Sequence, residues 1–150
     1  MHPDHPPFLR IGIDATNIRL GGGITHLLEF LEAIDPHKMK IKEVVIWAGR
    51  LTLNALPDRP WIRKINPDSL ERGLLCRVLW QIFALSNAVK RVQCDILFIP
   101  GGSYMGNFHP VVSMSQNLLP FEWGMIKQTG FSLRALKFIL LRWTQSITFK

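Results

Sequence analysis

The sequence predicts an α/β fold, in which helices cover both faces of a doubly wound, mainly parallel sheet. Short apolar runs suited to strands alternate with stretches whose apolar residues recur at helical spacing. Helices separate most of the expected strands, and this order favours parallel pairing. The run DILFI at residues 95–99 is apolar after its first residue, as expected for a strand that is covered on both faces.

The N-terminal unit, residues 9–34, is expected to form a strand, a glycine loop and a helix. The apolar run at 9–15 is followed by Gly21, Gly22 and Gly23, and apolar residues then recur at helical spacing as far as Ile34. Glycine permits backbone conformations that other residues avoid, and the free N–H groups at the start of a helix favour an anion. The three glycines are therefore candidates for a phosphate-recognising turn, although glycine runs also occur in loops that bind nothing.

The middle of the chain predicts two more strands, at residues 42–48 and 61–65. The second of them alternates apolar and basic residues, which suits a strand near a sheet edge. Residues 50–60 are expected to be a loop with at most a helical turn at 51–56. One long helix is expected over residues 70–92, followed by strands at 95–99 and 111–115. The apolar stripe predicted for that helix comprises Leu74, Leu75, Val78, Leu79, Ile82 and Leu85, widened by Trp80 and Phe83.

The two ends of the chain differ in character. Residues 1–8 predict a flexible N-terminal tail, and residues 120–130 an irregular segment. Residues 131–149 predict an amphipathic helix with basic residues on its polar side. Because no strand follows that helix, we expect a domain over residues 9–150 that is incomplete at its C-terminus.

Composition favours a folded protein with anionic partners. Hydrophobic residues make up 47% of the 150 residues, and 18 Lys and Arg against 11 acids give a formal net charge of +7. Such a charge attracts nucleotides, lipid headgroups, acidic glycans or nucleic acid. The basic side of the last predicted helix could contact the membrane surface, or it could be a solvated face whose apolar side packs on the sheet.

The remaining compositional signals suggest a cytoplasmic protein without a bound metal. The two cysteines, Cys76 and Cys94, lack the spacing of metal ligands. The first residues contain acid and proline where a signal peptide would have basic and apolar residues. No apolar run approaches the ~20 residues that a membrane span needs. We therefore expect a cytoplasmic location, which includes the inner face of the membrane.

The loops after the expected strands lack the motifs of several enzyme classes. No G-x-G-x-x-G directly follows the first strand, and the second strand ends in Trp47-Ala48-Gly49-Arg50 without an acid, which argues against a dehydrogenase. The G-x-x-x-x-G-K-[ST] loop and the G-x-S-x-G nucleophile turn are also absent from the sequence.

Two stretches resemble a known family. IGIDATNIRLGGGITHLLEFLEAI, residues 11–34, is similar to the N-terminal half of a GT-B glycosyltransferase of the nucleotide-sugar-dependent group called group 1 or family 4. CDILFIPGGSYMGNFHPVVSMSQNLLPFEW, residues 94–123, matches the strand, loop, strand and polar turn on the acceptor side of these enzymes. The resemblance covers roughly residues 9–150. It implies a Rossmann-like first domain that holds the acceptor, and a second domain that holds most of the nucleotide-sugar donor.

The resemblance also implies roles for particular loops. Gly21, Gly22 and Gly23 would face the donor diphosphate across the cleft between the two domains. Gln116 and Asn117 stand at the turn where many relatives carry a histidine next to an acid. Asn117 could hydrogen-bond a sugar hydroxyl but could not act as a base, so no catalytic residue is assigned.

Four other residues are implied to face the sugar or the acceptor, and the last three of them could instead be structural. They are Asn17, Gly102, Ser103 and Tyr104. The histidines His26 and His109 are interpreted as surface or capping residues rather than catalytic ones.

The implied reaction moves a sugar from a nucleotide-sugar to a hydroxyl of a glycan or a lipid-linked acceptor, with no cofactor besides the nucleotide-sugar substrate. The chain alone is expected to be inactive, because the donor-binding domain is missing from the 150 residues.

One alternative is a non-enzymatic basic Rossmann-like module that binds an anionic glycan, nucleic acid or a protein. No cluster of basic and aromatic residues on a strand supports nucleic acid. A third possibility is another nucleotide-dependent enzyme with an atypical glycine loop.

Overall fold

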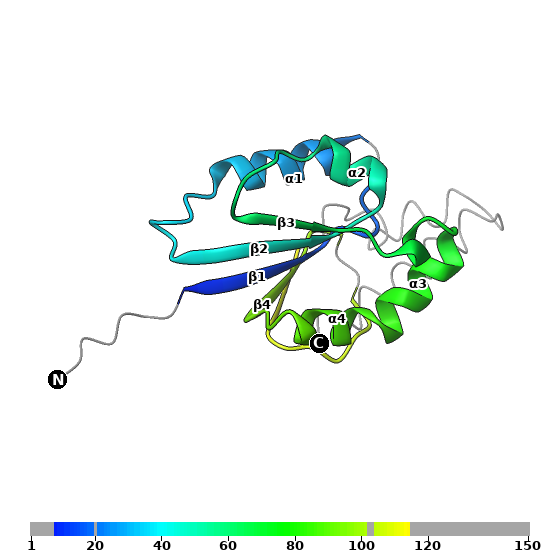
Figure 1. The fold of residues 1–150 in the computed structure, drawn as a ribbon. Coiled ribbons are helices and arrows are strands. Elements are labelled where there is room, and N and C mark those ends of the chain that lie inside the picture. The colour runs from blue at the N-terminus through cyan, green and yellow to red at the C-terminus, as the bar shows by residue number, and fades with distance from the viewer. Residues whose placement is uncertain (1–7, 20, 102–103, 115–150) are drawn as a thin grey trace, which may run out of the picture.

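The computed structural model describes residues 8–19, 21–101 and 104–114. Within them, five parallel strands form one sheet in the order β3-β2-β1-β4-β5, and helices cover both of its faces (Figure 1). The predicted doubly wound, Rossmann-like α/β fold is therefore confirmed. The strands are β1 (Leu9–Asp14), β2 (Ile41–Trp47), β3 (Ile62–Ile65), β4 (Ile96–Ile99) and β5 (Val111–Ser113).

The strand β1 occupies the centre of the sheet. It pairs with β2 on one side and with β4 on the other, so that Gly12 lies opposite both Val45 and Leu97. Glycine is required here by close packing rather than by backbone conformation. A Cβ atom at Gly12 would lie 3.1 Å from the Trp47 ring and 3.2 Å from Leu97. Neighbouring side chains from both partner strands thus meet across this position.

The helices divide between the two faces of the sheet. The helices α1 (Gly22–Ala33) and α2 (Arg50–Ala55) cover one face, and α3 (Leu74–Phe83) and α4 (Leu85–Arg91) lie on the other (Figure 1). A short 3-10 helix, η1 (Asp68–Leu70), precedes α3. The arrowheads of the strands point toward one edge, so the loops that leave their carboxyl ends gather there.

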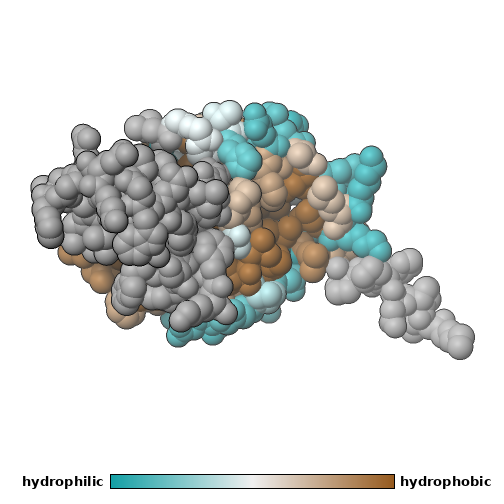
Figure 2. Space-filling view, turned by 180° about the vertical axis from the view of Figure 1, so that it is seen from behind, coloured by the Kyte–Doolittle hydropathy of each residue, from teal (hydrophilic) through white to brown (hydrophobic). Residues whose placement is uncertain are grey.

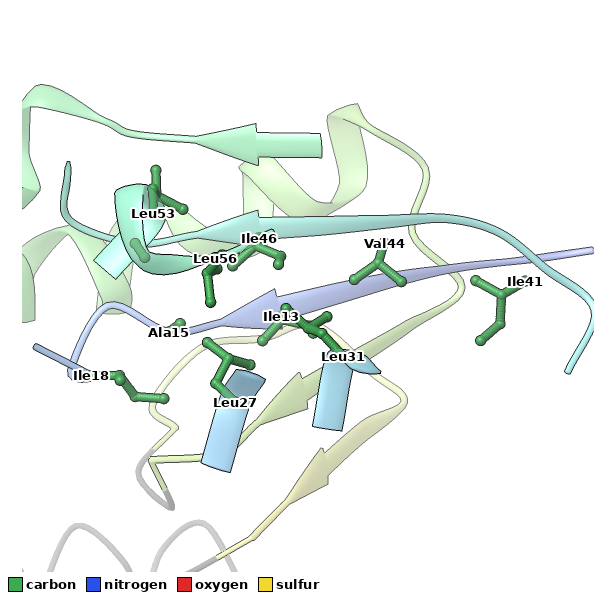
Figure 3. Packing of buried hydrophobic residues seen from close by; sticks show 11 residues of the cluster. Ile13, Ala15, Ile18, Leu27, Leu31, Ile41, Val44, Ile46, Leu53 and Leu56 are labelled. Atoms are coloured by element: carbon green, nitrogen blue, oxygen red, sulfur yellow. The ribbon is translucent and has the colours of Figure 1, made fainter. Parts of the chain in front are cut away.

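Each face of the sheet has its own apolar core. On the first face, Ile13 and Ile46 pack against Leu27 and Leu31 of α1, with Leu53 of α2 beside them (Figure 3). Because side chains alternate along a strand, the intervening residues of β2 point to the opposite core. That second core contains Val45, Trp47, Leu85, Val89 and Leu97. Two-sided burial explains why β2 is continuously apolar at its carboxyl half.

Most expected elements are confirmed, with small shifts of their ends. The three glycines mark the start of α1, with Gly21 as its N-cap and Gly22 and Gly23 as its first residues. The strand β3 is an edge strand of the described sheet, and the expected turn at 51–56 is the helix α2. The fifth strand ends at Ser113 rather than at residue 115. The predictions for residues 1–7, 120–130 and 131–149 lie outside the described residues.

The prediction of one long helix over residues 70–92 is wrong. The segment contains η1, α3 and α4, with Gly73 and Ala84 between them. Gly73 adopts φ +115°, a conformation that L residues rarely adopt, so the helix starts only after it. At Ala84 the chain changes direction, and this allows Leu85, Ser86 and Val89 of α4 to be buried.

The predicted apolar stripe of this segment is also wrong in part. Leu85 is buried, but Leu74, Leu75, Leu79 and Phe83 are between 44% and 71% exposed. The buried residue of α3 is Gln81, which is polar. The helix therefore turns a polar side chain toward the sheet, where Gln81 donates a hydrogen bond to Asp14 at the end of β1.

Apolar side chains also remain on the surface elsewhere. Seen from behind, they gather in the middle of the described surface, between hydrophilic areas above and below (Figure 2). Val112 of β5 is 49% exposed. Among the described residues, no helix combines the length and the apolarity that a membrane crossing requires.

The loop between β4 and β5 is fixed by a buried tyrosine. The Phe108 N–H donates to the Tyr104 hydroxyl at 2.7 Å, and the Ser86 hydroxyl lies 3.2 Å from that same oxygen. The Asn107 N–H donates to Ser86 Oγ at 2.9 Å. Gly106 passes close above this pair of hydroxyls, where a Cβ would lie 2.5 Å from Ser86 Oγ and 2.6 Å from the tyrosine oxygen.

We predict that Gly106→Ala lowers the free energy of unfolding by about 1–3 kcal/mol, because the new methyl group forces this hydrogen-bonded loop apart. Gly22→Ala is the matched control, because a Cβ at Gly22 meets nothing within 4 Å. It should leave stability within about 1 kcal/mol of the wild type. Urea unfolding of both variants measures the difference, and equal stabilities would contradict the packing at Gly106.

Candidate functional site

The candidate site lies at the carboxyl edge of the sheet, where β1 and β4 end side by side. The chain leaves β1 toward β2 on one side of the sheet, whereas β4 and β5 extend the sheet on the other. In open α/β sheets, ligands bind in the crevice at such a change of direction. The loops after Asp14 and after Ile99 border this point.

The structure brings two of the predicted loops together here. A Cβ atom on Gly101, which follows β4, would lie 3.7 Å from the Cβ of Asn17, which follows β1. Both residues are exposed. The Asn17 amide, predicted to face a sugar or an acceptor, thus lies at the surface of the carboxyl edge and next to the start of the β4–β5 loop.

The glycine turn lies in the same β1–α1 connection. Gly21 adopts φ +71° and is the N-cap of the 12-residue helix α1, and no side chain caps this helix. A Cβ atom at Gly21 or Gly22 would meet nothing within 4 Å, whereas one at Gly23 would lie 3.3 Å from Ile18. The first N–H groups of a helix have no partner within the helix, so this uncapped end presents donors to an anion.

Beneath this surface lies a buried carboxylate, that of Asp14. The Thr16 N–H and hydroxyl donate to its Oδ1 at 3.1 and 2.7 Å. Gln81 of α3 donates through Nε2 to its Oδ2. Burial raises the pKa of Asp14, and the hydrogen bonds from Thr16 and Gln81 act in the opposite direction.

Two further bonds fix the connection between β1 and α1. The Thr52 hydroxyl of α2 donates to the Ile18 carbonyl. Arg19 donates through Nη2 to the Leu70 carbonyl at 2.7 Å. The segment that carries Asn17 and the glycines is therefore attached to α2 on one face of the sheet and to η1 and α3 on the other.

The structure places the other predicted site residues in different surroundings, and some of them lie outside the described residues. Tyr104 is 6% exposed, and its hydroxyl bonds to the Phe108 N–H and to Ser86 inside the domain. Gly102, Ser103, Gln116 and Asn117 lie outside the described residues. His26 and His109 are exposed, in agreement with their interpretation as surface residues.

Sequence reasoning missed a group of charged residues beside this site. Four segments meet over the carboxyl ends of β1, β2 and β3, and each contributes one charged residue: Arg19, Arg50, Glu71 and Arg77. Arg19 and Arg50 could have been found, because each follows a predicted strand within a few residues. Glu71 and Arg77 could not, because their approach depends on the break of the predicted long helix at Gly73.

No group of three His, Cys, Asp or Glu side chains in the described part of the chain is close enough to hold a metal ion. Both cysteines are free, and burial raises the pKa of the Cys94 thiol to about 11. Such a thiol is a poor nucleophile at neutral pH.

Two hollows of about 530 and 210 Å³ lie away from the carboxyl edge. Both are bordered by Trp61, which precedes β3, and the larger one also by Phe8 and Ile41 at the starts of β1 and β2. They therefore open near the amino edge, opposite to the place where the fold favours a ligand.

Comparison of the chain with protein-family models, with curated proteins and with solved structures finds no match. The function of the chain is therefore inferred from its residues and their arrangement.

We predict a pH-dependent effect of Asp14→Asn. Because burial raises the pKa of Asp14, the folded state keeps this proton to a higher pH than the unfolded state does. The free energy of unfolding of the wild type therefore loses a contribution as the pH rises from 3.8, the ordinary value, through the folded pKa. Asparagine has no such proton, so the variant should gain stability relative to the wild type over this range.

Urea unfolding of both proteins between pH 4 and pH 8 measures this difference, with Glu29→Gln, an exposed acid of α1, as the control for replacing a carboxylate by an amide. A difference between Asp14→Asn and the wild type that stays constant with pH would show that Asp14 is not held in a desolvated site.

Proposed function

We propose that this chain forms the acceptor-side half of a GT-B glycosyltransferase, which moves a sugar from a nucleotide-sugar to a hydroxyl acceptor. In this proposal the glycine turn at the start of α1 faces the diphosphate of the donor. A second Rossmann-like domain would supply most of the donor contacts. No residue is proposed as a general base.

The observation that carries the proposal is the open, uncapped turn at Gly21–Gly23. Its first two glycines have no neighbour within 4 Å of a Cβ position, so a ligand can reach the backbone there. During sugar transfer the bond to the diphosphate breaks and negative charge grows on the departing phosphate oxygen. N–H donors fixed at the position of this oxygen stabilise the transition state more than the bound substrate.

The position of Asn17 supports the same assignment. Its exposed side chain lies in the same loop as the glycines and next to Gly101. An amide both donates and accepts hydrogen bonds, which suits a sugar hydroxyl. A glycan or a lipid-linked acceptor would approach along this edge, and the basic segment at 131–149 is a candidate for contact with anionic lipid in the second case.

We predict that Gly22→Val lowers kcat/KM for sugar transfer by about 100-fold, because the side chain fills the space in front of the turn and separates the N–H donors from the diphosphate. The open surroundings of Gly22 should allow the variant to fold. The matched control is Ala33→Val, at the opposite end of the same helix, which should stay within about twofold of the wild type because it lies far from the turn.

Transfer is measured with the full-length native polypeptide, radiolabelled nucleotide-sugars and an extract of glycans and lipids from the same cells. Absence of transfer from uridine, guanosine and adenosine diphosphate sugars would overturn the proposed function. Equal activity of Gly22→Val and the wild type would show that the turn does not face the donor.

A further inference from the structure

A group of three arginines and one glutamate lies over the carboxyl ends of β1, β2 and β3. Arg19 follows β1, Arg50 is the first residue of α2 after β2, and Arg77 belongs to α3. Glu71 lies between η1 and α3. Figure 1 shows α2 and α3 at the end of the sheet toward which these strands point. We call these four residues the arginine cluster.

Glu71 is the fixed centre of the arginine cluster. Its Oε1 accepts hydrogen bonds from the backbone N–H of Arg50 at 2.8 Å and from Asn66 Nδ2 at 2.9 Å. The same Asn66 nitrogen donates to the Ala48 carbonyl at 2.9 Å. These bonds, together with the charges of Arg19 and Arg50, lower the pKa of Glu71. Its carboxylate is therefore ionised at neutral pH and adds one negative charge.

The guanidinium groups are held by carbonyl and amide oxygens rather than by carboxylates. Arg19 donates to the Leu70 carbonyl at 2.7 Å, Arg77 donates through Nε to the Gly73 carbonyl at 3.2 Å, and Arg50 donates through Nε to Asn66 Oδ1 at 3.3 Å. Within the described part of the chain, none of the three forms an ion pair. Each of them has five N–H donors, so most of these donors remain available to a ligand.

The members of the arginine cluster are close enough to influence one another. A Cβ atom at Gly49 would lie 3.3 Å from Glu71 Oε1 and 3.8 Å from Arg19 Nη2, so both groups approach the same backbone position. Arg19 and Arg77 donate to backbone carbonyls that stand on either side of Glu71 in the chain. Partial burial and the positive charge of Arg19 lower the pKa of Arg77, while Glu71 raises it. Like charges without direct counter-ions repel one another, and a bound anion would relieve this repulsion.

The charge balance indicates the kind of anion. Three guanidinium groups and one carboxylate leave two positive charges, since arginine stays protonated in proteins. The neighbouring Asp68 and Arg72 are both exposed and carry opposite charges, so they do not change this balance. A phosphate monoester carries between one and a half and two negative charges near neutral pH, about the same magnitude. Planar guanidinium groups also match phosphate oxygens in two-point contacts.

We propose that the arginine cluster binds a phosphate monoester, which Arg19, Arg50 and Arg77 contact, while Glu71 fixes the Arg50 backbone at the start of α2. The monoester could be part of a small metabolite or of a lipid headgroup, and the chemistry of recognition is the same. The proposal does not depend on sugar transfer, because binding of the phosphate is measured without a donor.

The test measures binding of glycerol 3-phosphate to the full chain by calorimetry at low salt, and cosedimentation with vesicles of phosphatidylcholine that contain one fifth phosphatidic acid. The variants Arg19→Gln, Arg50→Gln and Arg77→Gln should each weaken binding about tenfold, because each loses a charge-assisted contact. Arg91→Gln, an exposed arginine at the end of α4, is the matched control for net charge and should bind like the wild type. Thermal unfolding of each variant verifies that it is folded.

Glu71→Gln supplies a change in the opposite direction. Its amide oxygen can still accept the Arg50 N–H, while the negative charge is lost, so the phosphate should bind about threefold more tightly. Loss of folding cannot produce this result.

Two outcomes would support the site and separate its sources. Binding of glycerol 3-phosphate without vesicle binding indicates a small phosphate ester, and vesicle binding that the three variants abolish indicates a lipid phosphate. The proposal is overturned if neither probe binds saturably. It is also overturned if Arg91→Gln weakens binding as much as the three cluster variants, since this would indicate attraction by net charge alone.

Discussion

The hydrogen bonds around the buried Asp14 carboxylate determine how the chain leaves the centre of the sheet. A carboxylate that is withdrawn from water must be hydrogen-bonded, or its burial destabilises the fold severely. Thr16 supplies two of these bonds from the connection itself, and Gln81 supplies a third from α3 on the other side of the sheet. The start of the β1–α1 connection is thereby fixed to a helix that lies some sixty residues later in the sequence.

The glycine turn and the arginine cluster both depend on this attachment of the β1–α1 connection to α3. The connection that begins at Asp14 carries Asn17 toward the end of β4 and Arg19 toward the arginine cluster, and it ends at the glycine turn. The Thr52 bond to Ile18 holds the same segment against α2. Arg19 and the glycine turn thus belong to one connection, whose described start is held by Asp14 and Thr52. Preorganised donors of this kind lose little entropy when a ligand binds.

Sequence patterns were sufficient to predict the strands of the sheet, but they did not predict the charged residues around the site. The apolar runs of β2 and β4 are buried on both faces, so their composition alone identifies them, and the three glycines mark the start of α1. The end of α3 at Ala84 has no such mark, because a continuous stripe of leucines suited one long helix. Glu71 and Arg77 approach Arg19 only because the predicted long helix is broken at Gly73, and no local pattern could have revealed them.

The orientation of α3 shows which requirement dominates at this edge. A helix with Leu75, Leu79 and Phe83 on one stripe would ordinarily turn these residues to the sheet. Here they are exposed, and Gln81 is buried against Asp14 instead. Rotation of α3 to bury the leucines would withdraw the Gln81 donor and would also move Arg77 away from Arg19 and Glu71. The polar requirement of one buried carboxylate, together with the packing of Trp80 on the second core, therefore orients α3 and the Arg77 that it carries.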